Sequence, residues 1–200
     1  MTKLANLVSV VLHPLCMPLL TLGLLLATDG YLTHRMALFS YLFVLLLINT
    51  VAPAISMFIL KKRGMISDWD IRMRRERPWP FLLVFAYYLM AYVLVAKSTA
   101  VEVPLFYRNV LLSLVVAIAF AWIVTWKIKI SMHMLAQGGI MGVYLRVAMT
   151  DQIWSLSWIS ALILSAGLVG WSRQHLGAHT SGELYLGYVL GVTSVWFTLF

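Results

Sequence analysis

The polar segment at residues 171–182 and the residue after it hold the strongest candidates for chemistry. Arg173 is followed after five residues by His179 and after three more by Glu183, in the pattern S-R-x5-H-x3-E. If a helix begins near His179, the histidine and Glu183 share one helix face. A carboxylate there can accept a hydrogen bond from Nδ1, which leaves Nε2 as a nucleophile or base. Arg173 adds forked donors suited to phosphate. Spacing alone is equally compatible with a simple ion pair at a helix end.

A second polar segment, residues 127–133, brings a hydroxyl and an imidazole together. Ser131 and His133 stand two positions apart, just where a hydrophobic run begins. The N-terminus of a helix attracts anions, so this segment is a candidate phosphate contact. Taken by itself, the pattern favours an interfacial loop whose lysines extend to the membrane surface.

A third polar segment, residues 61–79, is rich in positive charge. It holds seven of the 15 basic residues of the chain. The first three directly follow a hydrophobic run, which is typical of topology signals or of contact with anionic lipid. The remaining four, in the run R-x-R-R-E-R-P, are denser than topology requires. These four are Arg72, Arg74, Arg75 and Arg77.

The composition indicates which elements must position these segments. Of 200 residues, 62% are hydrophobic and 11% are charged, and the net charge is +8. Soluble domains are about 45–50% apolar and about 25% charged. The sequence therefore predicts an integral membrane protein and excludes an ordinary soluble domain, a disordered chain and a disulfide scaffold, since Cys16 is the single cysteine.

The hydrophobic runs predict an all-α polytopic bundle of six to seven spans, formed by residues 1–200 as one domain. With seven spans, the three polar segments fall on the same side of the membrane as the N-terminus. Two pairs of glycines predict close helix packing. The expected spans are 4–28, 36–60, 80–98, 105–126, 134–149, 154–170 and 183–200, and the pairs are Gly138-x3-Gly142 and Gly187-x3-Gly191.

Two further histidines are set aside at this point. His175 lies inside the third motif but off its pattern, and His13 lies in the first hydrophobic run. We interpret His175 as a loop residue. We expect His13 to take part in hydrogen bonding between helices or to lie at the membrane surface.

Together, the three polar segments resemble the motifs of the type 2 phosphatidic acid phosphatase (PAP2) superfamily, which read K-x6-R-P, P-S-G-H and S-R-x5-H-x3-D. The third motif agrees in spacing, with Glu183 in place of the family's aspartate. The second survives as Ser131 and His133, with Ile130 and Met132 replacing proline and glycine.

The first motif departs furthest from the family pattern. Arg77 and Pro78 are retained, but the family's lysine position holds Asp70. We expect Arg72 or Arg74 to turn inward and replace that lysine. Arg74 is the better candidate, because in a helix it would neighbour Arg77, whereas Arg75 is expected to face solvent or lipid headgroups.

The resemblance implies a metal-independent and cofactor-free mechanism. His179 would attack phosphorus and form a phosphohistidine, and Glu183 would hold its ring. His133 would protonate the leaving group and then activate water. The phosphate-binding residues implied are Arg77, Arg173, Ser131 and Arg74 or Arg72. The sequence itself contains no histidine, cysteine or carboxylate cluster typical of a metal site.

The expected substrate is a phosphomonoester or diphosphate on a lipid. Phosphatidate, phosphatidylglycerophosphate, polyprenyl diphosphate and lipid A phosphates all fit, and nucleic acid does not. The alternative is a non-catalytic or transport protein that binds anionic lipid or phosphate through a degenerate PAP2 site. The departures in the first two motifs favour this alternative, and retention of His133, Arg173 and His179 favours the enzyme.

The membrane side of the site stays open. The resemblance implies a bacterial cytoplasmic membrane, in which family members commonly face the periplasm. Eleven basic residues lie on the side of the three motifs and four on the other side. The positive-inside rule would then place the motifs in the cytoplasm.

Overall fold

The computed structural model describes residues 1–69, 71, 73–151 and 154–199, and these residues form helices and no strand. Among these residues, seven helices of at least ten residues follow the N-terminal helix α1, with the short helix α3 and one 3-10 turn, η1, between some of them. Their bounds are α1 Thr2–Val11, α2 Met17–Thr28, α3 Gly30–Thr33, α4 Met36–Lys62, η1 Arg74–Glu76 (one 3-10 turn), α5 Pro78–Ala96, α6 Leu105–Thr125, α7 Met132–Asp151, α8 Leu156–His175 and α9 Ser181–Leu199.

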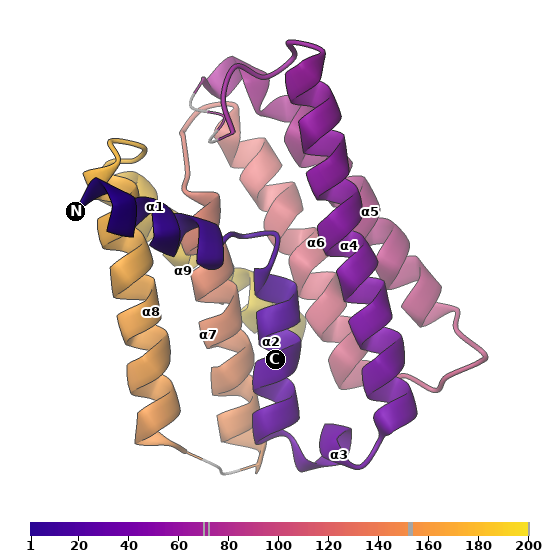
Figure 1. The fold of residues 1–200 in the computed structure, drawn as a ribbon. Helices are drawn as coiled ribbons and strands as arrows, with labels where there is room; N and C mark the ends of the chain where they lie inside the picture. Colours follow the sequence, from indigo (N-terminus) through magenta and orange to yellow (C-terminus); the bar gives the residue numbers. More distant parts are fainter. Residues whose placement is uncertain (70, 72, 152–153, 200) are drawn as a thin grey trace.

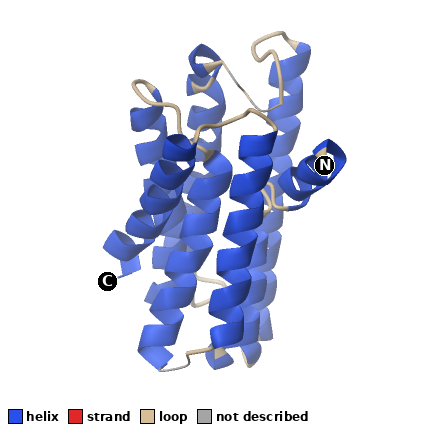
Figure 2. Ribbon diagram, turned by 90° about the vertical axis from the view of Figure 1, so that its left-hand side faces the viewer, coloured by secondary structure: helices blue, strands red, loops and turns tan. Residues whose placement is uncertain are grey.

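The long helices run alternately up and down in one bundle, with α1 lying across it against α7 and α8 (Figure 1). The view turned by 90° shows the same bundle with its helix axes roughly aligned, and the N-terminal helix projects from its side (Figure 2). This arrangement places alternate connections at the same end of the bundle. The sequence prediction of an all-α bundle is confirmed.

Four segments are long and apolar enough to cross a membrane: α4, the run Arg74–Ala96 that includes α5, α6 and α8. Many of their large apolar side chains point outward, as expected for helices surrounded by lipid. Helix α7 differs, because it lies inside the bundle and buries twelve of its 20 residues. The structure therefore supports a membrane protein with four candidate spans, fewer than the six to seven that the sequence predicts.

The first predicted span, residues 4–28, is wrong as a continuous helix. Helix α1 ends at Val11 and α2 begins at Met17, with a sharp change of direction between them (Figure 1). Proline has no N–H to donate and its ring clashes with the preceding turn. Pro14 therefore interrupts the helix, while Pro18 is tolerated in the first turn of α2.

Helices α7 and α9 form the closest contact in the bundle, which we call the glycine seam. A Cβ added at Gly138 would lie 2.1 Å from the carbonyl oxygen of Tyr188, and one added at Gly191 would lie 2.1 Å from that of Leu135. Only glycine permits such an approach of two backbones. The predicted role of these glycine pairs in helix packing is confirmed.

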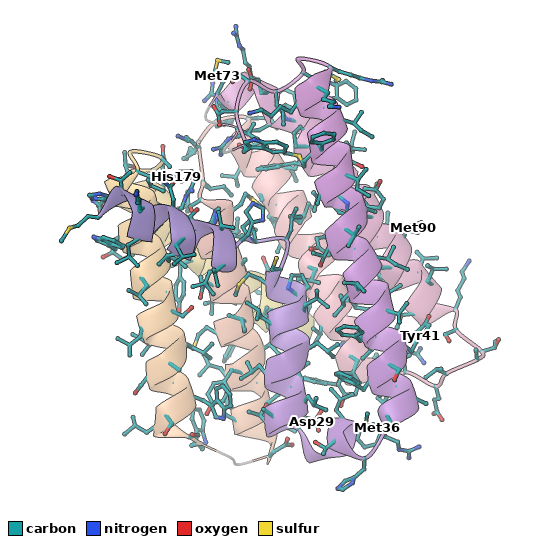
Figure 3. The ribbon with its side chains drawn as sticks, in the orientation of Figure 1. Asp29, Met36, Tyr41, Met73, Met90 and His179 are labelled. Carbon is teal, nitrogen blue, oxygen red and sulfur yellow. The ribbon has the colours of Figure 1, made fainter. Side chains whose placement is uncertain are left out.

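The three polar segments meet at one end of the bundle. In Figure 3, His179 and Met73 lie at this end, and Asp29 and Met36 lie at the other. Backbone contacts join the segments directly, because Ser131 N–H donates to the Glu183 carbonyl at 3.2 Å. The predicted convergence of the three segments is confirmed.

Candidate active site

The connection between α8 and α9 holds His179 through a Schellman turn. Ala178 N–H donates to the Arg173 carbonyl and Gly177 N–H to the Gln174 carbonyl, both at 3.0 Å. Gly177 has φ +62°, the left-handed conformation that this helix ending requires. The turn is short, so His179 follows the end of α8 closely and lies near Arg173.

The start of α9 is a capping box that also binds the histidine. Thr180 Oγ1 accepts from Glu183 N–H at 3.4 Å, and Glu183 Oε2 accepts from Thr180 N–H at 3.3 Å. The same Oε2 lies 2.8 Å from His179 Nδ1. A carboxylate accepts at this distance, so Nδ1 carries the hydrogen and the Nε2 lone pair is available. The predicted pairing of His179 with Glu183 is therefore present in the structure.

The environment of His179 keeps its ring neutral. Burial is the largest influence and lowers the pKa of His179 to about 4, although the hydrogen bond with Glu183 raises it. The positive charges of Lys129 and Arg77 lower this pKa further. At neutral pH, the imidazole is therefore unprotonated, which is the form needed for a nucleophile or a base.

Arg77 is buried, 3% exposed, at the start of α5. Its Nε donates to the Ile71 carbonyl and one terminal nitrogen donates to the Ile130 carbonyl, both at 3.0 Å. Its second terminal nitrogen has no hydrogen-bond partner among the described residues. The guanidinium thus ties the arginine-rich segment to the second polar segment while keeping donors for an anion.

Ser131 and His133 occupy different positions at the start of α7. The Ser131 hydroxyl accepts from Met134 N–H at 3.4 Å and so caps α7, and its side chain does not line the cavity described below. His133 lies on the cavity wall, with Nε2 3.0 Å from the carbonyl oxygen of Ser9. Because a carbonyl only accepts, this geometry places a hydrogen on Nε2.

Helix α1 contacts the third motif through a serine. Arg173 Nη1 donates to Ser9 Oγ at 2.7 Å, and Ser172 Oγ donates to the Ala5 carbonyl at 2.6 Å. The Ser9 hydroxyl also lies 3.2 Å from His133 Nε2. Ser9 therefore bridges two of the residues that the motifs single out.

A cavity of about 130 Å³ unites these side chains. His133, His179, Arg77 and Arg173 all line it, and most of the remaining wall is apolar. The wall also includes His13, whose ring meets that of His133 edge-on with 5.3 Å between centroids. Two arginines and three histidines thus surround a space at the end of an apolar bundle, which suits an anionic group on an apolar molecule.

Arg74 does not join this cavity, contrary to the sequence prediction. Its side chain is exposed, and Nη1 donates to the Lys127 carbonyl at 2.7 Å. The cause is the short 3-10 turn Arg74–Glu76, which directs Arg74 to the outer edge while Arg77 turns inward. Arg75 is exposed as expected, and Arg72 and Asp70 lie outside the described residues.

Three residues near the cavity were not assigned to the site from the sequence. Lys129 donates to the Ala178 carbonyl at 2.6 Å, within the loop that holds His179. Ser9 and His13 belong to the run expected to be one lipid-embedded span. The polarity of His13 within an apolar run was an available signal, whereas Ser9 had none. The prediction of His175 as a loop residue is wrong, because it is the last residue of α8, where it is exposed and stacks on Trp171 one turn earlier with 5.5 Å between ring centroids.

No family model, curated protein or solved structure matches this chain. Among the described residues, His, Cys, Asp and Glu side chains form no group of three or more suited to a metal ion. The interpretation of the site therefore rests on its own geometry.

Proposed function

We propose that the chain is an integral-membrane lipid phosphatase of the PAP2 type, with His179 as its nucleophile. The observation that supports this most is the His179–Glu183 pair, whose 2.8 Å contact leaves a neutral Nε2 beside a cavity lined by Arg77 and Arg173. A neutral imidazole between two guanidinium groups suits attack on a phosphoryl group. In this proposal α7 and α9 also cross the bilayer, which is that of a bacterial cytoplasmic membrane.

In the first step, Nε2 of His179 attacks phosphorus as the bond from phosphorus to the ester oxygen breaks. The product is an N-phosphorylated histidine, and the leaving alkoxide takes a proton from His133. Arg77 and Arg173 neutralise the phosphoryl oxygens, which is the main contribution that phosphoryl transfer requires. In the second step, water attacks phosphorus as the bond from phosphorus to Nε2 of His179 breaks, and the proton of the water passes to His133. Inorganic phosphate leaves, and His179 is free again.

In this scheme, Ser9 of helix α1 has to give up its contacts with His133 and Arg173 when phosphate binds. Nε2 of His133 and Nη1 of Arg173 both contact Ser9 in the structure. A phosphate group entering the cavity would compete with Ser9 for those donors. The Ser131 hydroxyl, which already caps α7, has a structural part in this scheme.

The test is release of inorganic phosphate by the purified protein from a panel of lipid phosphates, with EDTA present. We expect His179→Ala to abolish turnover and His175→Ala to retain it. His175 is the matched control, because it lies four residues away, is exposed and is outside the cavity. The wild type should also form an acid-labile, base-stable phosphorylated species.

Each outcome of this test is informative. Substantial hydrolysis by His179→Ala would contradict the assignment of the nucleophile. Loss of activity in EDTA that Mg²⁺ or Zn²⁺ restores would contradict the metal-independent mechanism. Binding of lipid phosphates without any release of phosphate would favour the non-catalytic alternative.

A further inference from the structure

A second cavity extends from the candidate active site into the bundle. It has a volume of about 90 Å³ and lies between α2, α4, α6, α7 and α9. Pro14, Tyr88, Ile118 and Met132 line both this cavity and the one that holds the histidines and arginines. The two spaces are therefore neighbours, with a polar chamber at the bundle end and an apolar one within it.

The wall of the inner cavity offers almost nothing to a polar ligand. Most of its side chains are Leu, Met, Val, Ile, Ala and Pro. The hydroxyls of Thr21 and Ser113 donate to carbonyls of their own helices at 2.9 Å and 2.6 Å, and the Tyr107 hydroxyl donates to Asp29. The fourth hydroxyl of this wall, that of Tyr88, belongs to a residue that also lines the outer cavity, so an occupant beyond it meets mainly apolar side chains and is thus a hydrocarbon.

The length of the inner cavity matches one lipid tail. Its lining runs from Tyr107 to Ile118 on α6 and from Met132 to Val143 on α7. At 1.5 Å per residue, each of these stretches is about 16 Å long. One leaflet contributes about half of the roughly 30 Å hydrocarbon core of a bilayer. The space is narrow over this length, so it can take no more than one chain.

A missing side chain creates part of this space. A Cβ added to Gly139 would meet no atom within 4 Å, although the residue lies on the buried helix α7 and lines the cavity. The neighbouring Gly138 has the opposite property, since its Cβ would collide with α9. The backbone nitrogen of Gly139 belongs to the glycine seam, since a Cβ added at Gly191 would lie 2.8 Å from it. Its own side-chain position faces open space, so the missing side chain keeps the cavity open.

We infer that the inner cavity holds one hydrocarbon tail of the substrate while its phosphate lies between Arg77, Arg173 and His179. This inference rests on the proposed function and narrows the substrate to a lipid phosphate that can thread a single chain into the bundle, rather than one whose tails all stay in the bilayer.

The test uses linear monoalkyl phosphates, from butyl to dodecyl, with the protein in lipid nanodiscs. For the wild type, kcat/KM should rise at least tenfold with chain length. Gly139→Leu should remove most of this rise and leave hydrolysis of butyl phosphate within about twofold. Ala117→Leu, which narrows the cavity from α6, should act in the same way.

Gly23→Leu is the matched control, because Gly23 also has no atom within 4 Å of an added Cβ but is exposed on α2. For Gly23→Leu, kcat/KM should rise with chain length as in the wild type. The loss of this rise in Gly139→Leu then could not be explained by partitioning of the longer substrates into the bilayer. If Gly139→Leu and Ala117→Leu fold and hydrolyse dodecyl phosphate like the wild type, the tail lies outside the bundle and the inference is wrong.

A binding arm separates this inference from the proposed function. Binding of dodecyl phosphate to His179→Ala protein is measured by native mass spectrometry, with and without Gly139→Leu. Binding that Gly139→Leu abolishes supports the tail site even if no variant releases phosphate, a result that would overturn only the hydrolysis. Equal binding with and without Gly139→Leu would overturn the tail site, whatever the activity.

Discussion

The two walls of the candidate active site are held by different kinds of contact. The glycine seam brings the backbones of α7 and α9 together, and Ser131 N–H joins them at the site through the Glu183 carbonyl. Helix α1 packs Val8 and Leu12 against an apolar cluster, but at the site it is held by hydrogen bonds from polar side chains to its two buried residues, Ala5 and Ser9. The wall formed by α7 and α9 is therefore held by backbone atoms that have no part in the proposed chemistry. The wall formed by α1 is held by Arg173 and His133, which are the groups expected to contact phosphate.

Substitutions in the glycine seam should have the largest effect on stability. In Gly138→Ala, the new Cβ would lie 2.1 Å from a backbone oxygen on α9 that cannot move without shifting the helix. We expect a loss of about 3 kcal/mol or more in the free energy of unfolding, the upper range for overpacking. Thermal unfolding in detergent measures it.

Gly139→Ala is the control for this prediction. Its Cβ meets nothing within 4 Å, so the variant should be unchanged or more stable by up to about 1 kcal/mol, the difference in helix propensity. Equal stability of the two alanine variants would show that the seam is not as close as described.

Two arginines of the first motif, Arg77 inside the cavity and Arg74 outside it, should differ in their effect on kcat. Arg77→Ala should lower kcat by about 10²–10³, because a charge-assisted contact in the transition state is lost. Arg74→Ala should lower it by less than about threefold, since Arg74 is exposed and bonds the Lys127 carbonyl outside the cavity. Phosphate release measures both, and a large loss in Arg74→Ala alone would reverse the assignment.

The lowered pKa of His179 should have a smaller effect, which is a dependence of stability on pH. Its pKa of about 4 lies below the usual 6.5, so the imidazole of His179 stays unprotonated in mildly acidic solution. Between pH 6.5 and pH 4, this histidine is protonated in the unfolded chain but not in the folded protein. The free energy of unfolding therefore decreases as the pH falls through this range.

Removing the charge of Lys129 should raise the pKa of His179. In Lys129→Met, kcat/KM should then decline at pH 5, where the wild-type value is unchanged from pH 7. Lys127→Met is the control, because this exposed lysine is not among the groups that shift His179. Identical pH profiles for the two variants would exclude Lys129 as an influence on the nucleophile.

The smallest effect concerns the contact between α1 and the site. Ser9→Ala removes the hydroxyl that Arg173 and His133 share, so an anion no longer competes with it. We expect vanadate to inhibit about 3- to 10-fold more tightly, on the scale of one hydrogen bond to a charged group. Leu4→Ala, on the exposed face of α1, should change nothing. Weaker inhibition of Ser9→Ala would mean that Ser9 helps to bind the anion.

Local signals in the sequence predicted the parts of the site that depend on neighbours along the chain. The pairing of His179 with Glu183 follows from a four-residue spacing at a helix start, and the glycine pairs follow from helix geometry. These features need no knowledge of the rest of the fold.

Features decided by distant contacts were not predictable in this way. Arg74 faces outward because a single 3-10 turn and the Lys127 carbonyl, 53 residues away, determine its direction. The break between α1 and α2 could have been predicted, because Pro14 lies within it. The docking of Ser9 on Arg173, in contrast, joins residues 164 positions apart. A serine in an apolar run usually bonds its own helix, so nothing local distinguished Ser9.

The glycine seam has a consequence for the entropy of the reaction. His133 stands at the start of α7, His179 just before α9, and the seam makes these two helices one rigid unit. In the proposed mechanism, the freedom that His133 and His179 must lose to face each other is then lost once, when the chain folds, and not again at each turnover. What would remain to be ordered is the substrate and the part of α1 that it displaces.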